Sequence, residues 1–198
     1  MISMPRRYDS SNRKHQAQET RRRILDAAVE LHARGITEVV PLAAAAGVSV
    51  PTVRKHFPSK ERIFEGCTAH FFSTFTLPDL ERAARSTDPR ERSARVTEEM
   101  CRAHEATHDL MWHAYPEAAR SAALAAALEG FVELIEAAVD VILNGVGEDV
   151  AARARPRLRA LLDTLTYRAF RVHAGLDAQA VQRELTTLIA SAIGTPPR

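Results

Sequence analysis

The sequence has 198 residues, a formal net charge of +2 and 45% hydrophobic residues. This composition supports a folded core in one or two domains and excludes a disordered chain. No stretch approaches the ~18 apolar residues of a membrane-spanning helix, and the polar, basic N-terminus lacks the apolar run of a signal peptide, so we expect a cytoplasmic protein. Cys67 and Cys101 are expected to be free thiols in a reducing compartment.

Charge is distributed unevenly along the chain. Residues 1–60 contain 11 Lys and Arg against 5 Asp and Glu, whereas residues 61–198 contain 16 against 20. A basic N-terminal part followed by an acidic remainder indicates a polyanionic partner for the N-terminal part. The alternative interpretation is a solvated basic tail.

The chain is expected to begin with a basic arm that is followed by a helix. Residues 1–19 are rich in basic and polar residues and indicate a flexible arm. A helical pattern begins near Thr20, and Gly35 supplies its stop. The apolar stripe of this helix comprises Ile24, Ala28 and Leu31.

Prolines and serines mark the next helix boundaries. Pro41 fits the first turn of a short second helix that ends in LAAAAG. Ser49 is a hydroxyl N-cap for a third helix that runs to about His56. Pro58 ends that helix, and Ser59 caps a fourth.

The remainder of the chain also reads as helices, because apolar residues recur at helical spacing and no alternating strand pattern occurs. The predicted fold is therefore all-α. The expected helices span approximately residues 59–75, 78–85, 89–108, 116–143, 156–175 and 177–192.

Two short helices joined by a Gly-Val-Ser turn predict a helix-turn-helix unit, whose second helix can lie in the major groove of DNA. Val53 and Phe57 lie four residues apart and should face inward. Thr52 can bond a base edge, and Arg54 can reach guanine or phosphate. Lys60 opens the next helix, where free N–H groups and a cation suit a phosphate. The candidate DNA-contacting residues are Arg22, Ser49, Val50, Pro51, Thr52, Arg54, Lys55, His56 and Lys60.

The segments RRILDAAVELHARG and LAAAAGVSVPTVRKHFPSKERIF resemble the N-terminal DNA-binding domain of tetracycline-repressor (TetR) family regulators, over residues 20–66. The resemblance implies a homodimer that binds a palindromic operator and is released when a small molecule enters the C-terminal domain. By position it implies a DNA contact for Thr52, a phosphate contact for Lys60 and a thymine-methyl contact for Pro51. It does not extend to the identity of the ligand.

The sequence departs from this family in three places. Arg54 stands where an aromatic residue, often a phosphate-binding tyrosine, is usual, and an arginine there can either contact a phosphate or read guanine. Glu38 and the two valines after it provide neither a hydroxyl cap nor a cation, so the second helix should contribute little to DNA binding. His32 stands where a core phenylalanine is common, and we expect a half-buried, hydrogen-bonded histidine there.

Three consecutive arginines, Arg21, Arg22 and Arg23, raise a separate question. If the first helix begins near Thr20, they occupy its first turn, where the helix dipole disfavours cations by ~0.3–1 kcal/mol each. An external phosphate would relieve this cost. Alternatively, the helix begins earlier and the arginines are simply exposed.

A second candidate site lies within TEEMCRAHEATHDLMWHAY, residues 97–115. On a helix, a Cys/His trio shares one face with polar and aromatic groups, a mixture typical of ligand pockets. A pocket for an organic effector is one interpretation; a packed or solvated polar stripe and a metal- or thiol-sensing site are the alternatives. The candidate ligand-binding residues are Thr97, Cys101, His104, His108, Met111, Trp112 and Tyr115.

The last two long helices each carry an apolar stripe, and pairing them with a symmetry mate would form a four-helix interface. The candidate interface residues are Leu158, Leu162, Leu165, Val181, Leu185, Leu188 and Ala192. The alternating arginines of RARPRLR, residues 153–159, are interpreted as solvated surface.

The sequence contains no G-x-S-x-G, glycine-rich phosphate loop or H-E-x-x-H, so we expect neither an enzyme nor a bound cofactor or metal. The predicted domains are a basic arm at 1–19, a DNA-binding domain at 20–64 and a ligand-binding and dimerisation domain at 65–198. The predicted function is a ligand-released repressor that binds a palindromic operator as a homodimer. The alternatives are an architectural DNA-binding protein without a ligand and a thiol- or metal-dependent enzyme.

Overall fold

The computed structural model describes residues 10–194, and every regular element in that range is a helix. The predicted all-α class is confirmed. No helix of the described residues is long and apolar enough to cross a membrane. The chain divides into two compact units, residues 1–73 and 74–198, which we call the head and the body.

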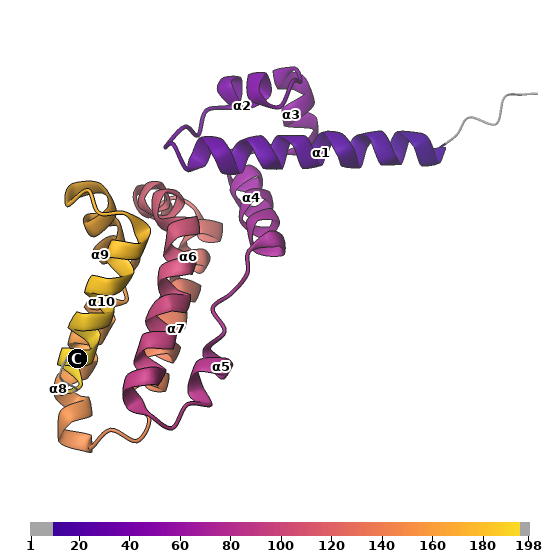
Figure 1. Ribbon diagram of the computed structural model, residues 1–198. Helices are drawn as coiled ribbons and strands as arrows, with labels where there is room; N and C mark the ends of the chain where they lie inside the picture. Colours follow the sequence, from indigo (N-terminus) through magenta and orange to yellow (C-terminus); the bar gives the residue numbers. More distant parts are fainter. Residues whose placement is uncertain (1–9, 195–198) are drawn as a thin grey trace, which may run out of the picture. The chain divides into compact units, whose positions relative to one another are not determined.

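The head consists of four helices (Figure 1). Their bounds are α1 (Ser10–His32), α2 (Val39–Ala45), α3 (Val50–His56) and α4 (Lys60–Thr74). The predicted boundaries of α2, α3 and α4 agree with the structure within a residue or two. The predicted domain limit at residue 64 falls inside α4, and residues 1–9 of the predicted arm lie outside the described residues.

Helix α1 begins ten residues earlier than the expected start at Thr20, since it already includes Ser10. Residues 12–19 are exposed and contain no large apolar side chain, so they gave no periodicity from which the helix could be predicted. Of the two interpretations of the three arginines, the earlier start is correct. Arg22 pairs with Glu19 at 2.8 Å and with Asp26 at 3.1 Å along the helix surface.

The core of the head is built on the predicted apolar stripe of α1. Ile24 and Ala28 are fully buried, and they pack with apolar residues of the other three helices. Val53 and Phe57 face inward, as expected, with 0% and 2% exposure. The other core residues include Leu42 and Ala43 of α2, and Ile63 and Cys67 of α4.

Two glycines are required by the packing of the head. Gly47 has a φ of 65° and closes the turn between α2 and α3, where its N–H donates to the carbonyl of Ala44. Gly66 allows α4 to approach closely, because a Cβ there would lie 2.8 Å from Cε1 of Phe57 and 3.0 Å from Cδ2 of Leu25. The orientation of α3 therefore depends on both the turn and the α4 contact.

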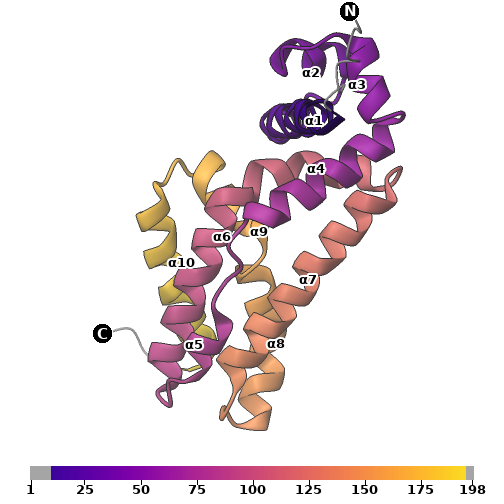
Figure 2. The same cartoon turned by 90° about the vertical axis from the view of Figure 1, so that its right-hand side faces the viewer.

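The body contains six α-helices and one π-helical turn in the described residues (Figure 2). Helix α6 packs against α5, α7, α9 and α10, and its residues Val96 and Met100 are buried beside Val139 and Ile142 of α7. The bounds are α5 (Leu80–Ala84), α6 (Pro89–Ala118), α7 (Ala122–Leu143), α8 (Glu148–Leu161), α9 (Thr164–Arg168), η1 (Ala169–His173) and α10 (Ala178–Ala192).

Two helix boundaries predicted at prolines were wrong. Pro116 lies in the last turn of α6 and Pro156 lies inside α8, and both side chains are exposed. Both helices are packed near their prolines, because Met111 is buried in α6 and Leu158 is buried in α8. Tertiary packing therefore offsets the ~3 kcal/mol that an interior proline costs a helix.

The helix predicted from Pro156 to Gly175 is instead three elements, α8, α9 and η1. Helix α8 ends at its C-cap Leu162. The carboxylate of Asp163 then caps α9 by accepting the N–H of Leu165 at 2.7 Å. The last helix is capped in the same way, because Asp177 accepts the N–H of Ala180 at 2.7 Å. Both acidic caps fit the positive end of a helix dipole.

Candidate nucleic-acid interface

The side chain of Ser49 fixes the start of α3, as the sequence predicts. Its Oγ accepts the N–H of Thr52 at 3.3 Å and lies 2.9 Å from Oγ1 of Thr52. The cap therefore holds the Thr52 hydroxyl at the first turn of the helix, where a recognition helix meets base edges.

The outward face of α3 is basic. Pro51, Arg54 and Lys55 are exposed and share one side of the helix at spacings of three and four residues. Val50 and Thr52 are half-buried beside them. Pro51, Arg54 and Lys55 thus lie on the side of α3 opposite its buried Val53, whereas Val50 packs against the core of the head.

His56 differs from the arginine and lysine before it. Burial and the nearby cations of Arg21 and Lys55 lower the pKa of His56 below its usual value, so its ring is neutral at pH 7. Its main-chain carbonyl accepts a hydrogen bond from Nη1 of Arg21 at 3.2 Å. His56 can therefore contribute a neutral donor or acceptor rather than a positive charge.

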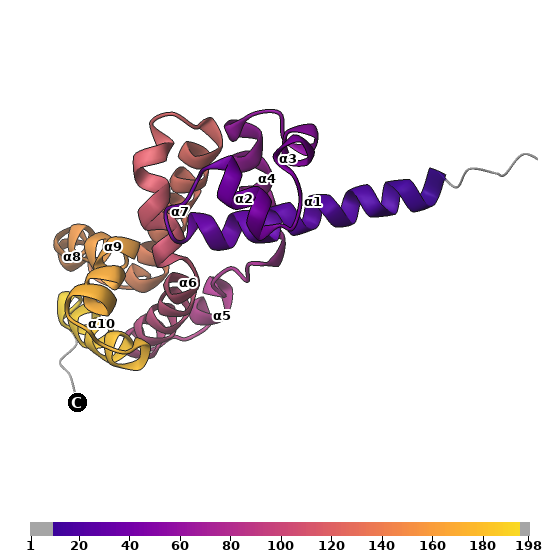
Figure 3. The same ribbon diagram turned by 90° about the horizontal axis from the view of Figure 1, so that it is seen from above.

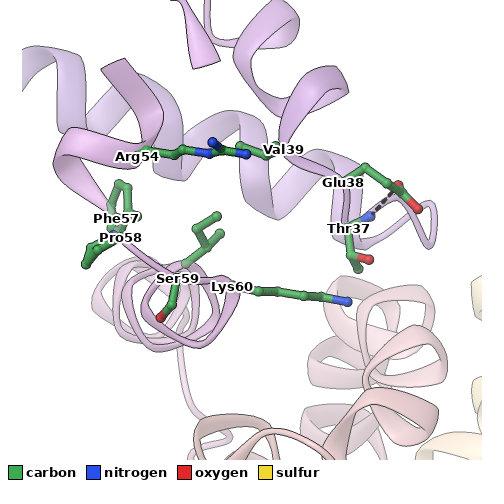
Figure 4. Close-up of a pocket in the computed structure, with 9 residues that line it drawn as sticks. Thr37, Glu38, Val39, Arg54, Phe57, Pro58, Ser59 and Lys60 are labelled. Carbon is green, nitrogen blue, oxygen red and sulfur yellow. Dashed lines mark hydrogen bonds between the residues drawn. The ribbon is translucent and has the colours of Figure 1, made fainter. Parts of the chain in front are cut away.

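A groove of about 440 Å³ lies beside α3 (Figure 4). Arg54 reaches into it from α3, and Lys60 lines it at the start of α4. The Ser59 side chain caps α4 by accepting the N–H of Arg62 at 3.2 Å. Two cations near a capped helix start make this groove suitable for a phosphate. Its other lining residues are Thr37, Glu38, Val39, Phe57, Pro58 and Ile63.

Thr37 and Glu38 line this groove, although neither was predicted to be part of the DNA-binding surface. Glu38 is the N-cap of α2 without a side-chain cap, and its carboxylate accepts the N–H of Thr37 at 3.1 Å. Thr37 lies one residue before this N-cap, so no capping signal marks it in the sequence. Glu38 places a negative charge in the same groove as Arg54 and Lys60.

The candidate effector residues of α6 lie along one helix face, and most of them are buried in the body. Thr97 is fully buried and donates to the carbonyl of Ser93 at 2.8 Å. Cys101 and Met111 are also buried, and His108 is nearly so. Trp112 and Tyr115 are exposed at 45% and 38%, so the structure separates them from the buried part of the set.

His104 is a buried structural histidine in this arrangement. Its Nε2 donates to the carbonyl of Leu162 at 2.9 Å, and its Nδ1 accepts from the hydroxyl of Thr164 at 2.9 Å. Burial lowers the pKa of His104 to about 4. The neutral ring therefore connects the C-cap of α8 to the first residue of α9 through two hydrogen bonds.

Metal and thiol chemistry finds little support in this part of the body. Burial raises the pKa of the Cys101 thiol to about 12, so the thiol stays protonated at pH 7. Among residues 10–194, no three His, Cys, Asp or Glu side chains are grouped so that they could hold a metal ion.

A groove of about 490 Å³ runs between α6 and the C-terminal part of the body, and Cys101 is the one candidate effector residue among its lining residues. In this groove the hydroxyl of Tyr167 donates to Glu105 at 2.6 Å, and Arg171 donates to the same carboxylate. The lining residues are Glu98, Glu99, Cys101, Arg102, Glu105, Ala106, Tyr167, Ala178, Gln179 and Gln182.

The candidate dimer residues divide into two groups. Leu158, Leu162, Val181 and Leu185 are buried inside the body itself, where a partner cannot contact them, so the expectation for these four was wrong. A helical stripe alone does not show which neighbour covers it. The residues that keep exposed or half-buried side chains are Leu165, Leu188 and Ala192.

The arginines of residues 153–159 are more organised than the sequence indicated. Arg155 donates to Asp140 at 2.7 Å, and Arg159 donates to Glu136 at 2.8 Å, so this pair fastens α8 to α7. Arg153 and Arg157 are exposed. The alternating sequence thus forms two rows, each with a spacing of four residues.

A short capped helix that follows a glycine turn and presents a basic face, carried on an all-helical body, defines a helix-turn-helix DNA-binding protein. Residues 24–67 match the profile of bacterial regulatory proteins of the tetR family. No curated protein is similar enough to the chain to count as a match. The matched residues run from within α1 to within α4, so the head carries a tetR-type domain.

Solved structures of two transcriptional regulators and of a multidrug binding protein share the fold. A transcriptional regulator from Rhodococcus sp. RHA1 has 20% identity and a TM-score of 0.65, covering 88% of this chain and 96% of its own. FadR from Bacillus subtilis, in complex with stearoyl-CoA, has 20% identity and a TM-score of 0.57, covering 86% and 97%. The multidrug binding protein EbrR, complexed with imidazole, has 20% identity and a TM-score of 0.50, covering 95% and 97%. The likeness thus spans both head and body.

Proposed function

We propose that this regulator is a repressor that binds a palindromic operator as a homodimer and is released by a small-molecule effector. The observation that carries the proposal is the basic face of α3, with Arg54 directed into a groove that also contains Lys60. Such a face is suited to base edges in the major groove, and such a groove is suited to the adjacent phosphate backbone.

The roles of the head residues follow from their places. Thr52 contacts a base edge through its hydroxyl or methyl group, and Pro51 offers an apolar surface to a thymine methyl. Arg54 contacts guanine or a phosphate, and Lys60 contacts a phosphate. Ser49, Val50, Lys55 and His56 complete this surface, whereas Arg22 is paired within α1 and contributes a long-range charge.

A homodimer explains how one short helix selects a long site. Two recognition helices read half-sites about 34–36 Å apart, so a twofold protein requires a palindrome. The exposed Leu165 and Leu188 support an interface on α9 and α10, together with Ala192. Val172 of η1 is a further large apolar residue of the body that is exposed, at 49%.

The effector site is proposed in the body, within residues 74–198. FadR and EbrR were solved with stearoyl-CoA and imidazole, which supports a body that binds organic molecules. Because Thr97, His104 and Met111 are packed, an effector at this face must part α6 from its neighbours, and this movement couples binding to release. Trp112 and Tyr115 provide exposed aromatic surface at one end of the face.

One observation favours a second candidate, an architectural DNA-binding protein without an effector. The predicted ligand face of α6 is buried, and both ring nitrogens of His104 are hydrogen-bonded. An enzymatic role has less support, because the Cys101 thiol is held protonated. We place the protein in the cytoplasm, where it has access to DNA.

The test begins with selection of bound duplexes from a random pool, followed by affinity measurements on the selected site and on random DNA. Arg54→Ala should weaken the selected site by ~1–3 kcal/mol if it contacts a base. Lys60→Ala should weaken selected and random DNA about equally. Equal losses on both DNAs for the two variants would remove the recognition role of α3, and an absence of any selected sequence would remove the repressor proposal.

Effector release is tested by screening small aromatic molecules, acyl-CoA compounds and zinc, nickel and copper salts for loss of operator binding. Release that is altered by Trp112→Ala supports the organic site. Release by a metal alone, abolished by His104→Ala and unchanged by Trp112→Ala, would replace it with a metal sensor. No release by any of these compounds would favour the architectural alternative.

A further inference from the structure

The N-terminal half of α1 stands apart from the core of the head. Helix α1 starts at Ser10, whereas the residues that match the tetR profile start at Ile24. Residues 12–19 are exposed, and Figures 1 and 3 both show this part of the helix continuing past α3. A short polar helix without packing is marginally stable in water. Residues 12–19 therefore do not contribute to the core of the head, and we looked for another function.

The inward stripe of α1 changes character along the helix. At 3.6 residues per turn, Arg13, Lys14 and Arg21 fall within the same arc of about 100° as the buried Ile24 and Leu31. The face that is apolar where it meets the rest of the head thus becomes cationic beyond it. A cationic continuation of a packing face suits a polyanion rather than a protein core.

Arg21 shows which way this stripe points. Its guanidinium lies 4.2 Å from the centroid of the Phe57 ring, and its Nη1 donates to the carbonyl of His56. Both partners are at the C-terminal end of α3. The stripe therefore faces the side of α1 on which α3 lies, and past the end of α3 nothing in the described head covers Lys14, which is exposed.

We propose that this extension of α1 contacts the phosphate backbone of the DNA that flanks each half-site, through Arg13 and Lys14. The inference rests on the proposed function, because it places the DNA against the outward face of α3. Lys14 lies seven residues before Arg21, or ~10 Å along the helix. This length corresponds to about three base pairs at 3.4 Å each, so the protein covers DNA beyond the bases that α3 reads.

The experiment compares two duplexes that contain the selected operator, one trimmed to the palindrome and one flanked on both sides by a helical turn of DNA. The double variant Arg13→Ala/Lys14→Ala should match the wild-type protein on the trimmed duplex. On the flanked duplex it should bind about tenfold more weakly at physiological salt. The slope of log affinity against log salt should fall in magnitude by ~1.8 per half-site, because each lost phosphate contact contributes ~0.9.

Two controls separate the position of the charges from their number. Arg153→Ala/Arg157→Ala removes the same charge from exposed positions on α8 and should leave both affinities unchanged. A relocation variant combines Arg13→Ala/Lys14→Ala with Asn12→Lys/His15→Arg, which places the two charges at exposed positions about 100° or more around α1 from both original sites. It should remain as weak as the double variant.

Three outcomes would overturn the inference. They are equal binding of the flanked duplex by the wild-type protein and the double variant, full recovery by the relocation variant, and equal weakening by the α8 control. Each of these leaves the selected operator and the effect of Arg54→Ala intact. A failure of the proposed function would instead appear as the absence of any selected operator.

Discussion

Arg92 of α6 donates a hydrogen bond from Nε to the main-chain carbonyl oxygen of Val141 in α7, across 2.8 Å. The same guanidinium donates to the carbonyl oxygens of Ser86, at 2.9 Å, and of Asn144. The Arg92 side chain is buried, and Val141 and Asn144 lie at the C-terminal end of α7, where the helix dipole is negative. A cation from another helix thus supplies the cap for α7.

Replacement of this cap is expected to destabilise the body. Arg92→Met removes the charged donor from three carbonyl groups and should lower the free energy of unfolding by ~2–4 kcal/mol. Urea unfolding measures the change. Arg92→Lys should recover only part of the loss, because a single ammonium cannot reproduce the guanidinium geometry. Arg95→Met, which removes an exposed pair with Glu91, serves as the control and should change stability by less than ~1 kcal/mol.

His104 is expected to make the body sensitive to acid. Its pKa is about 4 in the folded protein, chiefly because of burial, while Asp163 raises the pKa and His108 lowers it to smaller extents. In the unfolded chain the pKa is about 6.5, so the unfolded state binds more protons between these values. Stability is therefore full above about pH 6.5 and falls as pH decreases towards 4, by about 3 kcal/mol in total.

The measurement is the free energy of unfolding as a function of pH for wild-type protein and His104→Gln. The variant should show a shallower decline across this window. His173→Gln replaces an exposed histidine and should retain the wild-type curve. Identical curves for wild type and His104→Gln would mean that the buried ring does not control the acid response.

Glu38 is expected to weaken DNA binding. Its carboxylate lines the same groove as Arg54 and Lys60, so it opposes a phosphate there. Glu38→Gln should increase operator affinity two- to fivefold, or roughly 0.4–1 kcal/mol, with a smaller gain at high salt. Fluorescence anisotropy on a labelled operator provides the measurement. Glu30→Gln, at an exposed position of α1, should have a smaller effect, and equal gains for both variants would count against a phosphate in this groove.

Two leucines of α10 should respond differently to a charge. Leu188 is 40% exposed, so Leu188→Glu should give folded protein that scatters light as a 21.9 kDa monomer rather than as a dimer. Leu185 is 1% exposed, so Leu185→Glu buries an unpaired carboxylate and should unfold the body. Circular dichroism distinguishes the two cases. A dimeric Leu188→Glu protein would exclude this residue from the interface.

Local signals in the sequence were sufficient for α2, α3 and the start of α4. Ser49, Gly47 and Ser59 act through bonds to neighbouring residues, so their roles can be inferred without knowledge of the tertiary structure. The start of α1 could not be inferred in this way, because its exposed N-terminal half has no apolar period. The helix boundaries predicted at Pro116 and Pro156 were wrong because tertiary packing outweighs the intrinsic free-energy cost of a proline in a helix. The local sequence does not reveal this packing.

The candidate body sites show the limit of helical periodicity. A helical wheel correctly places Thr97, Cys101 and His104 on one face. It cannot show that Leu162 and Thr164 form hydrogen bonds with the His104 ring. The same limit applies to Leu185 and Leu188. One faces the body's own core and the other faces outward, and only the positions of neighbouring helices distinguish them.

The continuous course of α1 from Ser10 to His32 carries its N-terminal half away from the core of the head. A spin label at position 12 is separated from the core residue Ile24 by twelve residues of helix, or ~18 Å. A small rotation of the head therefore displaces the label much more than it displaces the core. In a dimer, the distance between the two labels would report the opening or closing of the heads when effector or operator is added.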